Sequence, residues 1–266
     1  MGAAVTLAAF PAPAKERSSE ALLQRKDLLY LYTASGERIP AVHIKRGSVG
    51  TDRVLIYSHG NAEDLGQRLA YLDLLSKICG ADVFAYEYCG YGLAEGTPSE
   101  DGCVACIEAA FQHLSKLFPP NRMIAFGRSI GAGPTLELAL RHPEIRGVVL
   151  QSPPESCGRA VFGSFAWAGY HLDIFRNYEK IGDVACPVLV MHGTIDEIVP
   201  WQHGVALHKA CRFAVPPLWV EDRGHNNMPN EVCLRRIREF FDELDGLSWG
   251  YSVFVNNLAT DISVAL

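Results

Sequence analysis

The chain has 266 residues, 48% of them apolar, which is enough material for one α/β domain around a single hydrophobic core. Its formal net charge of -6 offers no basic surface to collect phosphates, and this argues against nucleic-acid binding. No apolar run approaches the roughly 18 residues needed to span a bilayer, so no transmembrane helix is expected. Eight scattered cysteines favour reduced thiols in an intracellular protein over a disulfide framework.

Residues 1–26 show no steady period and are interpreted as a loosely ordered lead-in. They begin M-G-x-x-x-T, the pattern for N-myristoylation of Gly2 once Met1 is removed, although Met-Gly starts are also common without modification. The stretch has no basic n-region, which argues against a secretory signal peptide. Gly2 is therefore a candidate lipidation site.

The domain itself is expected over residues 27–245. Segments 28–33 and 39–45 flank Ser35-Gly36 and are predicted to form an antiparallel pair at one edge of a sheet. Further short apolar strands are predicted at 53–58, 82–88, 123–127, 147–150, 188–191 and 218–220. Helices between them are predicted at 65–79, from the capping box at 97–100 to about 119, and at 130–141, 201–211 and 231–244. Such alternation predicts a mostly parallel sheet with helices on both faces.

Some segments stand apart from this alternation. Residues 155–177 are rich in aromatic side chains and are interpreted as a small cap segment, whereas residues 246–266 form a tail to which we assign no role. In the helix after residue 97, Pro98 is expected at the first helical position. The C-x-x-C of Cys103 and Cys106 lies in the same helix without a second pair, so helix packing is favoured over a metal or redox role.

The sequence Gly127-Arg128-Ser129-Ile130-Gly131 is a G-x-S-x-G motif between a predicted strand and a predicted helix. A sharp turn there would lift Ser129 above the sheet, and glycines flank it because strand and helix pack without room for Cβ atoms. A glycine-rich loop with an incidental serine is the alternative, but the position of the motif favours Ser129 as a nucleophile.

A serine nucleophile needs a general base, and the base needs an acid to orient it. Among nine histidines, His225 lies in a loop just beyond a late strand, where the order Ser, acid, His would place it. Asp196 follows the preceding strand and is the preferred acid. Its rivals are Glu197, expected to point the other way, and Asp222, which is too close in sequence to His225.

Negative charge on the carbonyl oxygen of a substrate requires two backbone N–H donors during attack. Ile130 supplies one, and Asn61, in the loop after the strand at 53–58, is favoured for the other. His59 in that loop is interpreted as a loop-shaping residue. Phe162, Phe165 and Trp167 of the cap segment are candidates for an acyl pocket, although such aromatics also commonly pack a cap helix onto a sheet.

Between these motifs the chain resembles the α/β-hydrolase domain-containing protein 17 family of palmitoyl-protein thioesterases. The resemblance covers about residues 27–244 and is carried by the segments SHGNAEDLG (58–66), YCGYG (88–92), GTPSE (96–100), GRSIG (127–131), SPPES (152–156), HLDIFRNYEKI (171–181), PVLVMHGTIDEIV (187–199) and PLWVEDRGHNN (217–227). It implies an α/β-hydrolase fold and hydrolysis of the thioester between a fatty acyl chain and a protein cysteine, with no cofactor and no metal.

By this resemblance Ser129, Asp196 and His225 occupy the positions of the family's triad, and Ile130 and Asn61 those of its oxyanion hole. S-acylated proteins are the implied substrates, with peripheral association at the cytoplasmic face of membranes. The chain departs from the family in three places. Arg128 replaces the usual glutamine, Asn227 replaces the usual aspartate, and no cysteine precedes Cys79. The family's acylated N-terminal cysteines are thus absent, and a Met-Gly start, as in plant-like relatives, favours myristoylation instead.

Two other functions stay open on the sequence. A soluble carboxylesterase or lipase-like enzyme acting on small esters would use the same nucleophile, base and acid, because only the acyl pocket and the docking surface would differ. A non-catalytic scaffold that kept the fold is the third interpretation, and the intact set of Ser129, Asp196 and His225 argues against it.

Overall fold

The computed structural model describes residue 10 and residues 18–46, 52–162 and 173–246. Its centre is an eight-stranded sheet in the order β1-β2-β4-β3-β5-β6-β7-β8. The strands are β1 Leu28–Tyr32, β2 Arg38–Ile44, β3 Val54–Ser58, β4 Asp82–Tyr86, β5 Met123–Arg128, β6 Gly147–Gln151, β7 Val188–Gly193 and β8 Leu218–Val220. β2 runs antiparallel to β1 and β4, and the remaining pairs are parallel. The predicted antiparallel edge and parallel centre are confirmed.

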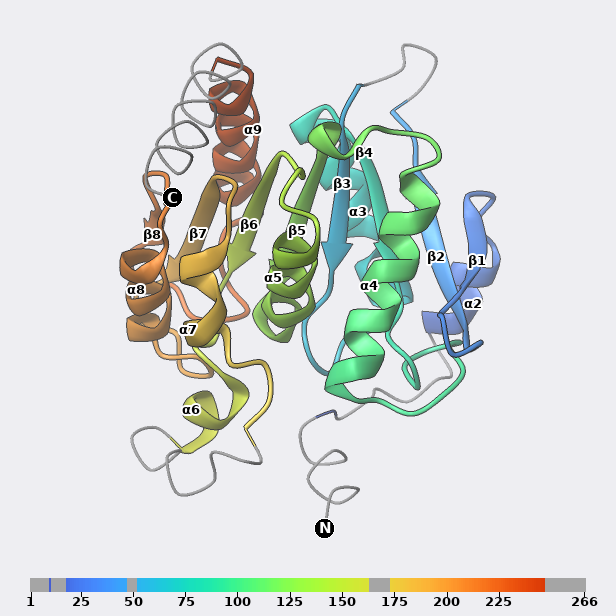
Figure 1. Ribbon diagram of the computed structural model, residues 1–266, viewed down its shortest axis with the longest axis horizontal. Helices are drawn as coiled ribbons and strands as arrows, with labels where there is room; N and C mark the ends of the chain where they lie inside the picture. Colours follow the sequence, from blue (N-terminus) through green and yellow to red (C-terminus); the bar gives the residue numbers. More distant parts are fainter. Residues whose placement is uncertain (1–9, 11–17, 47–51, 163–172, 247–266) are drawn as a thin grey trace, which may run out of the picture.

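Helices cover both faces of the sheet (Figure 1). They are α2 Ser18–Leu23, α3 Leu65–Cys79, α4 Glu100–Leu114, α5 Ala132–Arg141, α6 Cys157–Phe162, α7 Asn177–Lys180, α8 Trp201–Ala210 and α9 Asn230–Gly246, with 3-10 turns η1 Pro120–Arg122, η2 Ser129–Gly131 and η4 Ile181–Asp183. Side chains of α4, α5 and α8 belong to one core, and those of α2, α3 and α9 to a second core on the other face. Every residue of β3 to β7 is buried, as expected for a parallel sheet between two helical layers.

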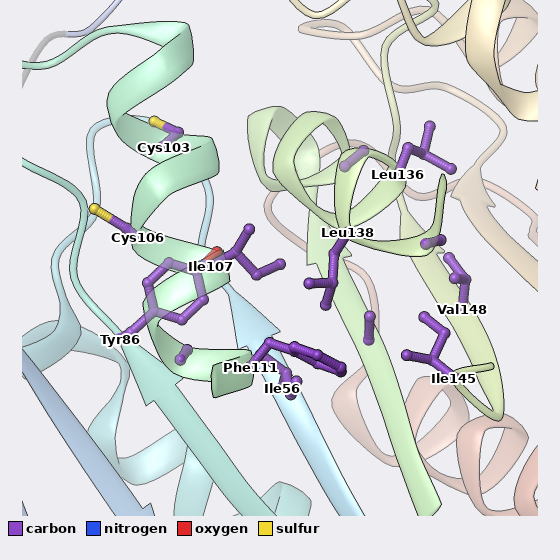
Figure 2. Close-up of a cluster of buried hydrophobic side chains, with 14 of the residues drawn as sticks. Ile56, Tyr86, Cys103, Cys106, Ile107, Phe111, Leu136, Leu138, Ile145 and Val148 are labelled. Carbon is purple, nitrogen blue, oxygen red and sulfur yellow. The ribbon is translucent and has the colours of Figure 1, made fainter. Parts of the chain in front are cut away.

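The first of these cores lies between α4, α5 and the sheet. Figure 2 shows part of it, with Ile107 and Phe111 of α4 in the same buried cluster as Ile56 of β3. Cys103 and Cys106 are buried on α4, and the Sγ of Cys106 lies 3.4 Å from that of Cys89. All eight cysteines are free. The C-x-x-C therefore serves in helix packing, and its nearest thiol partner comes from another element.

The termini of two helices show how the sequence sets their bounds. Before α3, the Asp64 carboxylate accepts the N–H of Gln67, and Gly80 ends the helix in the left-handed region at φ 67°. Before α4, Ser99 is the N-cap because its hydroxyl accepts the N–H of Gly102 at 3.0 Å. Pro98 thus precedes the cap, and its prediction as the first helical residue is wrong. Pro98 instead packs where a Cβ on Gly90 would meet it at 2.4 Å.

The lead-in is more ordered than predicted in the part that the structure describes. Residues Ser18–Leu23 form α2, whose Leu22 is buried in the core shared with α3. Phe10 is also buried and packs edge-on against Phe175, with 6.2 Å between the ring centroids. Among the described residues of this stretch, the apolar side chains of Phe10 and Leu22 are buried, and two such positions set no sequence period. None of the helices within the described ranges is long and apolar enough to cross a membrane.

Candidate active site

Ser129 lies at a sharp turn between β5 and α5. Its φ of 54° is in the left-handed region, which a residue with a side chain adopts only when its surroundings impose it. A Cβ on Gly127 would lie 2.4 Å from the Gly131 carbonyl oxygen, and one on Gly131 would lie 2.3 Å from that of Ser58. Both glycines are therefore required by close backbone contacts, and the turn projects Ser129 at the carboxyl ends of the strands.

His225 and Asp196 meet Ser129 at this edge of the sheet. His225 follows β8 and Asp196 follows β7, so the parallel strands bring both loops to the same end. The Ser129 Oγ lies 3.0 Å from His225 Nε2, and His225 Nδ1 lies 2.8 Å from Asp196 Oδ2. The three residues are 5 to 8% exposed. The rival carboxylates Glu197 and Asp222 are exposed. The arrangement can pass the serine proton to the imidazole and stabilise the imidazolium that results.

Asp196 has more partners than His225 alone. Its Oδ1 accepts the backbone N–H groups of Ile198 at 3.0 Å and Val199 at 2.8 Å, and its Oδ2 also lies 3.2 Å from Nε2 of His192. Burial opposes the carboxylate charge, but the hydrogen bonds from His192 and His225 outweigh burial and hold the pKa of Asp196 well below its usual range. The carboxylate therefore stays ionised.

His192 is a site residue that the sequence reasoning missed. It is fully buried at the end of β7, and its Nε2 also lies 2.9 Å from the Val199 carbonyl oxygen. Because that oxygen is only an acceptor, Nε2 carries the proton and can share it with Asp196. The H-G-T-x-D spacing, which places a histidine four residues before the acid, was the signal that could have identified it.

The two predicted oxyanion donors lie in adjacent segments. Gly131, next to Ile130, comes so close to the Ser58 and His59 carbonyl groups that the turn at Ser129 and the loop carrying Asn61 are in backbone contact. The Asn61 side chain accepts the Tyr91 hydroxyl at 2.8 Å, which fixes the loop at that residue. The backbone N–H groups of Asn61 and Ile130 thus belong to two segments that contact each other next to Ser129.

His59 is buried, and the hydrogen bonds of its ring go to residues other than Ser129. Its Nε2 pairs with Glu87 at 2.7 Å, and Nδ1 lies 2.9 Å from the Gly60 carbonyl oxygen. Burial lowers the pKa of His59, but attraction to Glu87 and the hydrogen bond to it raise that pKa above its ordinary value. Glu87 also accepts the Leu65 N–H at 2.8 Å. The buried pair therefore holds both ends of the loop that carries Asn61.

The structure tests the predicted cap residues only in part. Phe165 and Trp167 lie outside the described residues, and Phe162 is the last residue of α6. Phe175, from the same aromatic segment, is fully buried at φ 50°, in contact with the first turn of α5. A Cβ on Gly133 would lie 2.1 Å from its ring. Phe175 is thus a core residue. Within the described ranges no group of three or more His, Cys, Asp or Glu side chains could hold a metal ion.

Comparison with known proteins places this geometry in a family. Residues 50–165 match the serine aminopeptidase S33 family of hydrolases. A stretch of 225 residues is 37% identical to alpha/beta hydrolase domain-containing protein 17C of Mus musculus, covering 84% of this chain and 69% of the relative. Protein 17B of Homo sapiens is 38% identical over 214 residues, covering 79% and 73%. The chain belongs to the α/β-hydrolase domain-containing protein 17 family.

Solved structures of esterases share the fold of this family member. Est1E from Butyrivibrio proteoclasticus, with ferulic acid bound, superposes with a TM-score of 0.68 at 16% identity and covers 82% of this chain and 99% of its own. The Pyrococcus furiosus esterase Pf2001 gives 0.64 at 20% identity, covering 87% and 98%. At these identities the likeness establishes the α/β-hydrolase fold. Together with the sequence relatives, it identifies the chain as a hydrolase of the serine-hydrolase type.

Proposed function

We propose that this protein is a thioesterase that removes long fatty acyl chains from protein cysteines, with Ser129 as nucleophile, His225 as base and Asp196 as the orienting acid. The observation that carries the proposal is the continuous contact from Ser129 Oγ to His225 and from His225 to Asp196, at 3.0 and 2.8 Å, in a member of the protein 17 family. The family resemblance suggests a thioester as the substrate, and the geometry of the three residues supports hydrolysis as the reaction.

The reaction follows from the positions of these groups. His225 Nε2 accepts the Ser129 proton as Oγ attacks the thioester carbonyl carbon, and backbone N–H groups of Ile130 and Asn61 stabilise the oxyanion. The carbon–sulfur bond breaks, the cysteine sulfur takes up the proton that His225 received and leaves as a thiol, and the acyl chain remains on Ser129. Water, deprotonated by His225, then releases the fatty acid. Because a thiolate leaves readily, His225 has less to do as a general acid than it would for an amide.

Exposed aliphatic side chains beside the acid support an apolar substrate. Ile195 and Ile198 flank Asp196 and Glu197 and are 59% and 50% exposed. The aromatic side chains of Phe162, Phe165 and Trp167 are proposed to receive the acyl chain. Each methylene removed from water contributes about 0.8 kcal/mol, so a pocket favours long chains strongly over short ones.

Membrane attachment forms part of the proposal, since a palmitoylated protein is found at a membrane surface. We propose that Gly2 is myristoylated and that the enzyme is peripheral at the cytoplasmic face. One myristoyl chain binds only marginally, so a second signal is needed, such as contact of the exposed aliphatic side chains with lipid. Mass spectrometry of the protein from its native host tests this, and an unmodified Gly2 would contradict it.

The function is tested with two peptides that differ only in the acylated residue, cysteine or serine, each carrying chains from about four to about sixteen carbons. We expect efficiency to rise with length for the thioesters and Ser129→Ala to be inactive. Phe165→Asp should lose activity selectively toward long chains. A flat length profile, or a preference for the short serine esters, would support a small-ester hydrolase instead. If the folded protein fails to react with a fluorophosphonate, both the thioesterase and the small-ester hydrolase proposals are contradicted.

A further inference from the structure

Arg128 precedes Ser129, and its guanidinium contacts the two loops on either side of the site. Nη1 donates to the Glu63 carboxylate, in the loop between β3 and α3. Nη2 donates to the Asn226 side-chain oxygen at 2.8 Å and to the His225 carbonyl oxygen at 3.3 Å. The side chain is 8% exposed. One buried cation therefore links the loop that carries Asn61 to the loop that carries His225.

The contact with Glu63 continues into the loop backbone. The second oxygen of Glu63 accepts the Gly60 N–H at 3.2 Å and lies 3.5 Å from the Arg68 guanidinium. Gly60 itself lies against Arg128, since a Cβ there would be 2.7 Å from Nη1. The guanidinium thus occupies the space beside the residue that directly precedes Asn61, and Glu63 accepts the backbone N–H of that residue.

We propose that Arg128 is a positioning residue. It holds the loop that carries Asn61 and the loop that carries His225 in fixed positions on either side of Ser129. The proposal rests on the roles given above to Ser129, His225 and Asn61. It goes beyond them by assigning a function to a residue that touches neither the substrate nor the reacting atoms. It also gives a role to the charge by which this chain departs from the glutamine implied by the family resemblance.

The chemistry explains why such a link matters. The base must stay within hydrogen-bond reach of Oγ while the oxyanion donors keep their distance from the carbonyl oxygen, and displacement by about 1 Å can cost about 10²-fold in rate. The two groups lie on separate loops that follow β8 and β3, which are not neighbours in the sheet. A planar guanidinium with several fixed donors can bridge both loops, whereas an ammonium acts as one point charge.

The test compares Arg128→Met and Arg128→Lys with a matched control, Arg146→Met. Arg146 also donates to a main-chain carbonyl and to a carboxylate, those of Leu244 and Asp245, but directly precedes β6, away from the carboxyl ends of the strands. The readouts are kcat and KM on a short p-nitrophenyl ester, the rate of fluorophosphonate labelling, and thermal unfolding. None of these depends on an S-acylated protein, so a failed thioesterase assay leaves this test intact.

We expect Arg128→Met to lower kcat and the labelling rate by about 10 to 10²-fold with KM little changed. Arg128→Lys should recover thermal stability more fully than kcat, because it keeps the charge opposite Glu63 but not the bridge. Arg146→Met should keep kcat whatever its stability. Combining Arg128→Met with Glu63→Gln should lower kcat by less than the product of the single effects, since the two residues act as a unit.

Three results would overturn the proposal: wild-type kcat and labelling in folded Arg128→Met, an equal loss in Arg146→Met, or full recovery of kcat by lysine. Should Arg128→Met fail to fold, Asn226→Ala replaces it. Asn226 is exposed, and its side-chain amide oxygen accepts a hydrogen bond from Arg128 on the histidine side. A several-fold lower kcat at unchanged unfolding temperature would support the bridge, and an unchanged kcat would refute it.

Discussion

Replacing His192 by leucine tests the environment of the acid. The substitution removes the N–H shared between Asp196 Oδ2 at 3.2 Å and the Val199 carbonyl at 2.9 Å. It also removes Nδ1, a buried atom without a hydrogen-bond partner among the described residues. The Val199 carbonyl oxygen loses its hydrogen-bond partner, which costs about 1–3 kcal/mol. Removing the buried, unpaired Nδ1 removes a penalty of similar size, so the two changes offset each other. What remains is one hydrogen bond to a buried carboxylate, worth about 1.5–3 kcal/mol.

We therefore expect His192→Leu to lower the free energy of unfolding by about 1.5–3 kcal/mol at pH 7, measured by urea denaturation. His192→Gln is the matched control, because its amide can place a donor where Nε2 lies, and it should lose less than half as much. Activity should follow the same order if Asp196 orients His225 as proposed.

The difference in free energy of unfolding between wild type and His192→Leu should depend on pH with a definite sign. A carboxylate whose pKa is lowered in the folded protein adds stability above its unfolded pKa, about 3.9, and loses it as the pH falls through the lowered value. Without His192, the pKa of Asp196 moves back toward that ordinary value. The gap between wild type and His192→Leu should thus be constant from pH 7 to about 5 and narrow below about 4. A gap that does not change with pH would show that the effect comes from packing, and would refute the reasoning.

Three further outcomes follow from the site. Ser129→Ala should lower hydrolysis by about 10³-fold or more with thermal unfolding unchanged, measured by steady-state kinetics and calorimetry. Gly131→Ala should unfold at lower temperature and lose fluorophosphonate labelling, because its Cβ would lie 2.3 Å from a backbone oxygen, whereas Gly182→Ala, with 3.5 Å to its nearest atom, should be tolerated. Glu87→Gln breaks a buried ion pair and should cost about 3–5 kcal/mol in denaturant unfolding at pH 6. Since the pKa of His59 is raised in the folded protein, that loss should shrink as the pH rises through the raised value.

Local signals made much of the fold and site predictable. Ser129 directly follows a short strand, and Asp196 and His225 lie within five residues of the ends of two others, so their positions in the chain placed all three at one edge of a parallel sheet. The distances between them needed the structure. The cap of α4 was misassigned because Thr97 and Ser99 are both suitable residues, and only the contact of Ser99 with Gly102 distinguishes them.

Contacts between distant parts of the chain that belong to no motif could not be predicted. Arg128 reaches Glu63 across 65 residues and Asn226 across 98, and no spacing rule joins such positions. Phe175 was grouped with the cap because its neighbours are aromatic. Its burial depends on Gly133, whose missing side chain leaves room for the ring, and a pattern within one segment carries no information about such a distant partner.

The contact between Phe10 and Phe175 limits how far a lipid on Gly2 could lie from Ser129, the proposed nucleophile. Phe175 packs on the first turn of the helix that follows Ser129, so Phe10 is fixed to the protein near the same end of the sheet. Gly2 precedes Phe10 by eight residues, and a chain of that length spans at most about 28 Å when fully extended. In an enzyme held by that lipid, Ser129 would stay close to the membrane, and only cysteines near the bilayer surface would be within its reach.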